Sequence, residues 1–144
     1  MDPTIIPTIN ELGLSQSRPT ENTRKKATQL LDYLYTHKFA TLRYKASDMQ
    51  LHIDNDAAYL VAPGAKSRIA GYYYLSINHT PTSDTIEPKP PLNSPVHNEC
   101  RRLKHVVSSS AEAETWGIYS NCQTVVLLRQ MLTALCHTQQ PSKW

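Results

Sequence analysis

The chain has 144 residues, of which 40% are apolar and 19% are charged, and its formal net charge is +3. These proportions predict one globular core of ordinary size, and they exclude a largely disordered chain or one with a dense basic footprint for nucleic acid. No run of about 18 apolar residues and no secretory leader pattern occur, and the three cysteines are odd in number, so we expect an intracellular protein with reduced thiols and no membrane span.

Two helices are predicted before the first strand. Apolar residues at helical spacing predict a short helix over residues 4–16, and Thr20 is placed to cap a stronger helix over residues 21–37. The first turns of this second helix carry a basic group, Arg24, Lys25 and Lys26. The group is either a solvated helix face or a contact for phosphate, and the sequence leaves both interpretations open.

From residue 39 onward the apolar period changes from 3.6 to 2, which predicts strands. The pattern favours four of them, over residues 41–44, 49–56, 70–77 and 96–108. Prolines are concentrated between residues 80 and 95, which predicts an extended loop with little regular pairing.

The last predicted helix opens at a capping box. Ser109 is followed three residues later by Glu112, so a helix is expected from about residue 110 to 135, with an unstructured end after it. The complete order predicts an α+β fold in which a long helix packs on a mostly antiparallel sheet, preceded by two helices. We expect a helical region over residues 1–38 and the sheet domain over residues 39–144.

Two acidic clusters are candidates for chemistry: Asp54-Asn55-Asp56 at a predicted strand end and Glu112-Ala113-Glu114 at a helix start. Carboxylates from separate elements are the usual ligands of Mg²⁺ in phosphodiester hydrolysis. On the last predicted helix, the stripe expected to face the sheet is Ile118, Cys122 and Val125, and Glu114 is in line with it. A carboxylate at such a position needs a partner such as a metal. Asp54 and Asp56 share one strand face, so either is a candidate ligand, and both are equally explained as solvent-facing acids.

Three short motifs follow one another along the chain: Asp56-Ala57-Ala58-Tyr59, then residues 66–72 (KSRIAGY), then residues 107–114 (VSSSAEAE). This ordered set resembles the ribonuclease H region of Ty1/copia retrotransposon polyproteins. Residues 19–34 are also similar to the helix that joins reverse transcriptase to ribonuclease H in such polyproteins. The resemblance spans about residues 15–140. It implies a reverse transcriptase tail over residues 1–38 and a truncated ribonuclease H-like domain over residues 39–144.

The resemblance implies a nuclease that uses Mg²⁺ to cut the RNA strand of RNA/DNA hybrids. Matched by motif, Asp56 is the first-strand carboxylate and Glu114 is the helix carboxylate. The family places a further carboxylate on a strand after this helix, whereas no aspartate or glutamate follows Glu114 here. We therefore expect no cleavage by this chain alone. Weak binding of a hybrid is expected through five basic residues, Arg24, Lys25, Lys26, Lys66 and Arg68.

Two other functions are compatible with the same sequence. One is a domesticated, non-catalytic interaction or structural module, and the other is a module that binds RNA or a hybrid without cutting it. The strands expected after the last helix in the family are missing, which leaves one sheet edge open. We expect this edge to be covered by a protein partner or by the N-terminal helices.

Overall fold

A computed structural model of the chain describes residues 3–78 and 89–140. The chain divides into two compact units, residues 1–42 and residues 43–144. None of the helices in the described ranges is both long enough and apolar enough to cross a lipid bilayer.

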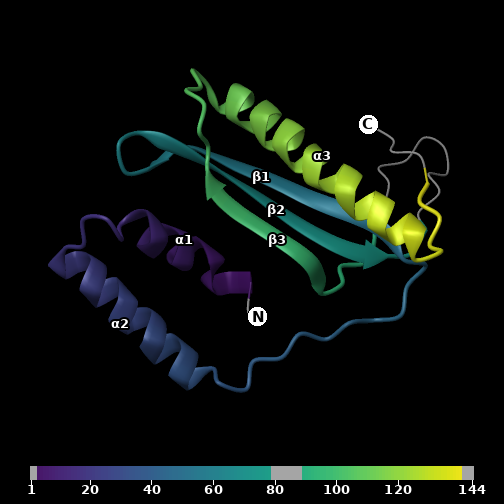
Figure 1. Cartoon of the computed structure of the whole chain (residues 1–144), viewed down its shortest axis with the longest axis horizontal. Helices are drawn as coiled ribbons and strands as arrows, with labels where there is room; N and C mark the ends of the chain where they lie inside the picture. Colours follow the sequence, from purple (N-terminus) through teal and green to yellow (C-terminus); the bar gives the residue numbers. More distant parts are fainter. Residues whose placement is uncertain (1–2, 79–88, 141–144) are drawn as a thin grey trace. The chain divides into compact units, whose positions relative to one another are not determined.

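The first unit holds a short 3₁₀ turn, Pro3–Ile5, and two helices, α1 (Ile6–Leu14) and α2 (Glu21–Thr36) (Figure 1). Thr20 caps α2 as predicted: its hydroxyl accepts a hydrogen bond from the Thr23 amide at 3.2 Å, and the Thr23 hydroxyl accepts one from the Thr20 amide at 3.2 Å. Both predicted helices are confirmed.

The second unit holds three strands and one long helix: β1 (Gln50–Ala62), β2 (Lys66–Ser76), β3 (Pro95–Arg102) and α3 (Ser110–Ala134). The strands form an antiparallel sheet in the order β1-β2-β3, and α3 runs across one face of it (Figure 1). The predicted α+β architecture, with a long helix on a mostly antiparallel sheet, is therefore confirmed.

The predicted strand at residues 41–44 is wrong: this segment has no regular secondary structure, and side chains of the segment before β3 bond the backbone of Arg43 and of the adjoining Lys45. The amide of Lys45 donates to Asn93 Oδ1 at 2.9 Å, and Asn93 Nδ2 donates to the carbonyl oxygens of Lys45 at 2.9 Å and Leu75 at 2.8 Å. The Ser94 hydroxyl donates to the Arg43 carbonyl oxygen at 2.5 Å. Asn93 is buried, so it replaces a strand ladder at this position.

The other strands differ from the prediction mainly at their ends. β1 continues past Asp56 to Ala62, so the acidic cluster at residues 54–56 lies within a strand and not at its end. β3 ends at Arg102, well before the predicted residue 108. Of the predicted proline-rich loop, residues 80–88 lie outside the described residues; residues 89–94 have no regular secondary structure, and Pro95 begins β3.

The core lies between α3 and the sheet, and it is formed by Ile69, Leu103, Val107 and Ala113, with Ala57, Tyr59 and Trp116 packed against it. The buried side of α3 is Ala113, Gly117 and Asn121. The predicted stripe through Ile118 is therefore wrong, since 48% of the Ile118 surface is exposed. Small residues at every fourth position let the helix backbone approach the sheet closely, and this spacing sets which side is buried.

The C-terminal segment after α3 is not free, although it has no regular secondary structure. The Leu51 amide donates to Gln139 Oε1 at 3.0 Å, and Gln139 Nε2 donates to the Met49 carbonyl oxygen at 2.9 Å. Gln50 completes the contact, because its side chain bonds the backbone of Thr138 at 2.9 Å and of Gln140 at 3.0 Å. The described part of the predicted unstructured end thus holds the start of β1.

Candidate functional site

A buried polar network joins α3 to the middle of the sheet. Asn121, which is 1% exposed, donates from Nδ2 to Asn55 Oδ1 and to the Ala70 carbonyl oxygen at 2.9 Å. Its Oδ1 accepts a hydrogen bond from the Tyr73 hydroxyl at 3.2 Å. Buried polar groups need such partners, and here one asparagine supplies them to both β1 and β2. Burial raises the pKa of Tyr73 to about 12, so its hydroxyl is protonated near neutral pH.

Two glycines make room for this network. A Cβ atom on Gly117 would lie 3.1 Å from Asn55 Oδ1 and 3.4 Å from Ile69 Cγ2. A Cβ atom on Gly71 would lie 2.8 Å from Tyr73 Cε2 and 3.1 Å from Asn121 Cγ. Any larger residue at either position would push the helix away from the sheet or displace the hydrogen-bonding side chains.

The two aspartates of the acidic cluster point away from this network. Neighbouring residues of a strand face opposite sides of the sheet, and Asn55 faces α3, so Asp54 and Asp56 are on the other side. Asp54 forms an ion pair with Lys89 at 2.7 Å, and Asp56 is exposed. Asn55 is therefore the polar residue of this cluster that contacts α3, and neither Asp54 nor Asp56 faces the helix.

The two glutamates of α3 have different surroundings. Ser109 caps the helix by accepting a hydrogen bond from the Glu112 amide at 3.1 Å, as predicted. Glu112 Oε2 accepts from the amide and the hydroxyl of Ser108, at 2.7 and 2.8 Å, and these bonds hold the pKa of Glu112 below its usual value. Glu114 is half-buried and lies two turns before Asn121, on the same side of the helix.

Asp56 and Glu114 thus come from opposite sides of the β1 strand. Glu114 is on the helix that covers one face of the sheet, and Asp56 is on the other face. Within the described ranges, no group of three or more His, Cys, Asp and Glu side chains is placed to hold a metal ion. Two further residue types that can bind a metal, His97 and Cys100, lie on opposite faces of β3. His97 contacts Tyr73 on the side of α3, and Cys100, three positions along the strand, faces the other side.

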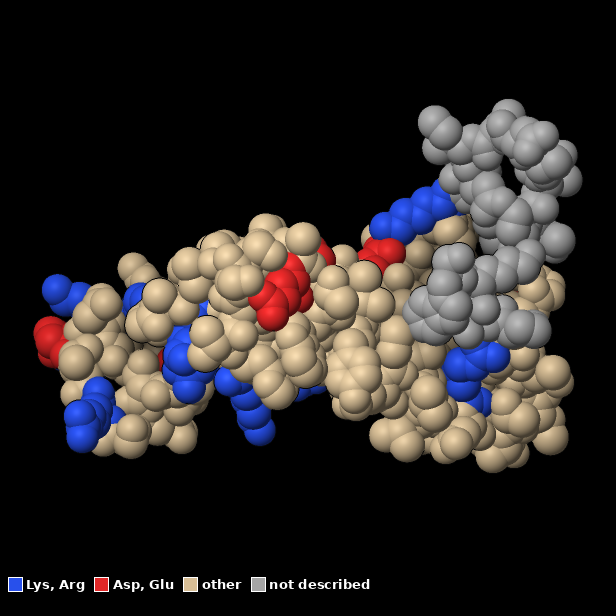
Figure 2. Space-filling view, turned by 90° about the horizontal axis from the view of Figure 1, so that it is seen from above, with Lys and Arg blue, Asp and Glu red and all other residues tan. Residues whose placement is uncertain are grey.

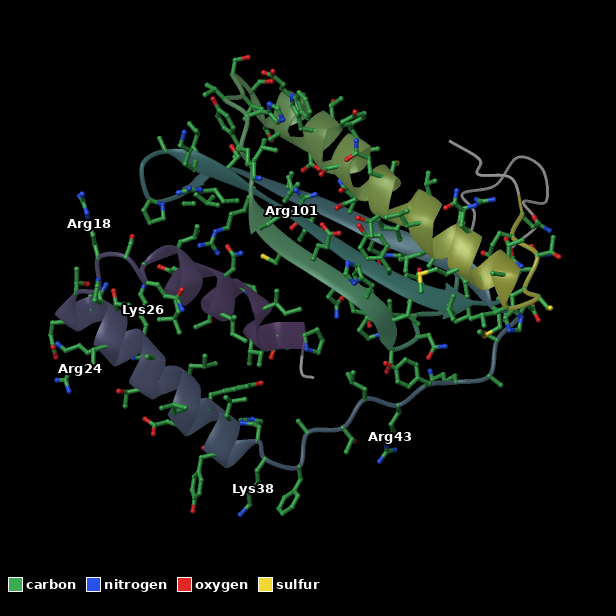
Figure 3. The ribbon with its side chains drawn as sticks, viewed as in Figure 1. Arg18, Arg24, Lys26, Lys38, Arg43 and Arg101 are labelled. Atoms are coloured by element: carbon green, nitrogen blue, oxygen red, sulfur yellow. The ribbon has the colours of Figure 1, made fainter. Side chains whose placement is uncertain are left out.

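The five basic residues predicted to bind nucleic acid are divided between the two units, three in the first and two in the second. In the first unit Arg24 is exposed but pairs with Glu21 at 2.7 and 3.0 Å, and Lys26 pairs with Glu11. Figure 3 shows Arg24 pointing outward from α2 and Lys26 pointing toward α1; Lys25 is exposed. In the second unit, the remaining two, Lys66 and Arg68, are half-buried on β2.

Arg68 gains a basic neighbour on the sheet face opposite α3, because it is the register partner of Arg102 on β3. Figure 2 shows lysine and arginine scattered over the face that it displays, without one dense basic patch. Within the second unit, Arg68 and Arg102 therefore offer a local phosphate contact on β2 and β3.

A charged cluster beside the network was not predicted. Glu99 on β3 accepts hydrogen bonds from Thr124 Oγ1 at 2.7 Å and Arg101 Nε at 3.0 Å, and it lies 3.3 Å from His97 Nε2. Burial alone would raise the pKa of Glu99, but the hydrogen bonds from Thr124, His97 and Arg101 outweigh burial and lower it. The sequence does contain a pattern that could have predicted this cluster, because His97, Glu99 and Arg101 alternate along β3 and so share one face of the strand.

Comparison with known proteins finds no family model that matches this chain, no similar protein among the curated ones and no similar solved structure.

Proposed function

We propose that this chain carries a remnant of a ribonuclease H-like domain of the Ty1/copia type, which does not cut RNA/DNA hybrids on its own. The observation that carries the proposal is the composition of the core. Ala57 and Tyr59 come from the first motif, Ile69 from the second, and Val107 and Ala113 from the third, and all five pack together. The three motifs that carry the resemblance are thus neighbours in space and jointly build one sheet–helix unit.

Hydrogen bonds connect the motifs as well. The Tyr59 hydroxyl donates to the Ser108 carbonyl oxygen at 2.9 Å, which joins the first motif to the third. The Leu60 amide, directly after the first motif, donates to Ser67 Oγ of the second motif at 3.2 Å. A long helix that opens at the third motif and covers the sheet is compatible with the ribonuclease H-like arrangement that the resemblance implies.

The lack of cleavage is supported by the placement of the two carboxylates. Hydrolysis with two Mg²⁺ ions needs several carboxylates converging on one site, with the ions about 4 Å apart. Asp56 lies on the sheet face opposite α3, whereas Glu114 lies on α3 itself, so the two carboxylates are on opposite sides of β1. Asp56 and Glu114 remain the residues with which Mg²⁺ would associate in the ancestral site, but their placement does not favour two fixed ions.

A cleavage assay on an RNA/DNA hybrid with Mg²⁺ or Mn²⁺ tests this proposal. We expect no cut RNA from the parent chain, and none from an Asp56→Asn, Glu114→Gln double variant. Cleavage by the parent that disappears in the double variant would contradict the proposed inactivity and establish the site. Weak hybrid binding through the basic residues should decline steeply with salt, and Lys66→Gln, Arg68→Gln is the variant that should reduce this salt dependence; the residues are Arg24, Lys25, Lys26, Lys66 and Arg68.

The alternative, a non-catalytic interaction module, is favoured by the outer surface of α3. Ile118, Tyr119, Val126, Leu127 and Met131 are between 48% and 62% exposed. A helix that is apolar on several sides is normally covered by other parts of a protein or by a partner. If the chain works as such a module, light scattering should detect self-association that a Val126→Ser, Leu127→Ser variant reduces. A monomer at all concentrations, unchanged by this variant, would argue against self-association.

A further inference from the structure

Two aromatic rings and one carboxylate line a pocket on the outer side of α3. The pocket has a volume of about 350 Å³, and Glu112, Thr115, Trp116 and Tyr119 line it. The ring centroids of Trp116 and Tyr119 are 5.5 Å apart, with the ring planes at 88°. Because these residues are three and four positions apart, they lie on one side of the helix. The pocket therefore presents two aromatic surfaces at a right angle, with an acid in the first turn.

The main aromatic surface is held in place before any ligand arrives. The His105 ring stacks on Trp116 with the centroids 4.0 Å apart and the planes 14° apart. Trp116 also packs against the core formed by Ile69, Leu103, Val107 and Ala113. The Tyr119 ring is 57% exposed, and its only ring contact among the described residues is with Trp116. Because the Trp116 ring is already held in place, less side-chain entropy is lost when a ligand binds.

The carboxylate of Glu112 is also fixed. Oε2 accepts both hydrogen bonds from Ser108, at 2.7 and 2.8 Å. Among the described residues, the hydrogen bonds to this carboxylate both end on Oε2 and none ends on Oε1. The pocket thus combines aromatic faces, which attract cations, with a negative charge that has one oxygen open to a donor.

We propose that this pocket binds the guanidinium group of an arginine side chain on a protein partner. A guanidinium group is planar, so it can stack on an aromatic ring while one N–H group donates to a carboxylate oxygen. A quaternary ammonium group would use the aromatic faces but has no N–H to donate to Glu112. Arginine is also enriched at protein interfaces. The site uses α3 residues outside the Asp56 and Glu114 positions, so it does not depend on the ribonuclease H-like assignment.

Fluorescence of a single tryptophan tests the proposal. The chain has two tryptophans, so Trp144→Phe leaves Trp116 as the reporter. The probes are three capped tripeptides that differ only in the central residue: arginine, citrulline or trimethyllysine. We expect a saturable change with the arginine peptide, at least about tenfold weaker binding of the uncharged citrulline peptide, and intermediate binding of the trimethyllysine peptide.

Two further variants separate the pocket from its surroundings. Tyr119→Leu removes an exposed ring, and Glu112→Gln keeps an acceptor for Ser108 while removing the charge. Each should weaken binding of the arginine peptide about fivefold or more, with an unchanged far-ultraviolet circular dichroism spectrum. Equal responses to arginine and citrulline, or binding unchanged by Tyr119→Leu, would overturn the proposal. Tighter binding of trimethyllysine than of arginine would overturn the choice of guanidinium.

Discussion

Asn121 should be among the most costly residues to change in the second unit. In Asn121→Ala the side chain can no longer bond Asn55, the Ala70 carbonyl group or the Tyr73 hydroxyl. Three buried hydrogen bonds contribute about 1 kcal/mol each, and the acceptors left unpaired add a further penalty of about 1 kcal/mol. Alanine regains about 0.7 kcal/mol as a better helix former. We expect a net loss of about 3 kcal/mol in the free energy of unfolding.

Urea unfolding at 25 °C, followed by Trp116 fluorescence in the Trp144→Phe background, measures this loss in the sheet unit. The matched control is Gln123→Ala, two residues along α3 at an exposed position, which should be neutral or slightly stabilising. A double-mutant cycle with Tyr73→Phe should give a coupling energy of about 1 kcal/mol, since the two side chains share a hydrogen bond. A loss in Asn121→Ala of under about 1 kcal/mol would refute the network as a source of stability.

Two other predictions concern buried residues of the same unit. Burial raises the pKa values of Tyr73 and Tyr74 to about 12, above the value of about 10 in the unfolded chain. The stabilisation from burying these two protonated hydroxyl groups is therefore complete below pH ~10 and is lost as the pH rises to ~12. Urea unfolding across this range should show a declining free energy of unfolding, with a smaller decline in Tyr73→Phe; a flat profile would contradict it. Gly117→Ala should destabilise by about 1 kcal/mol, because crowding against Asn55 exceeds the gain in helix propensity. The control is Gly13→Ala in α1, where the added Cβ would meet nothing within 4 Å and a gain in thermal stability is expected. If thermal unfolding shows that both substitutions stabilise the chain, the close-packing argument is refuted.

Local signals were sufficient to predict most of the elements. The caps at Thr20 and Ser109 are side-chain hydrogen bonds within a few residues, so the starts of α2 and α3 could be found from the sequence. The strand predicted at residues 41–44 failed for the opposite reason. The backbone of Arg43 is bonded by Ser94 and that of the adjoining Lys45 by Asn93, about 50 positions away along the chain. A period of two cannot distinguish a strand from an extended segment that side chains hold in this way.

The buried side of α3 could not be found from hydrophobicity. Apolar residues occur on several sides of this helix, so no single stripe dominates, and the side that faces the sheet holds Ala113, Gly117 and Asn121. Small side chains on this side let the helix pack closely on the sheet. The polar side chain of Asn121 can be buried there because β1 and β2 supply its hydrogen-bond partners. The predicted stripe through Ile118 depended on the wrong assumption that the most apolar side is buried, whereas Glu114, two turns before Asn121, does lie on the side of the helix that faces the sheet.

The packing of α3 also bears on the proposed loss of cleavage. For Asp56 to face α3, β1 would have to shift by one residue, because adjacent strand positions face opposite sides. That shift would remove Asn55 from Asn121, and it would take Ala57 and Tyr59 out of the core. The contacts that hold the sheet unit together therefore oppose the movement that would bring Asp56 to the side of Glu114. A nuclease site built from these two carboxylates would need a different β1 register, and the Asn55–Asn121 hydrogen bond stabilises the register in which they are apart.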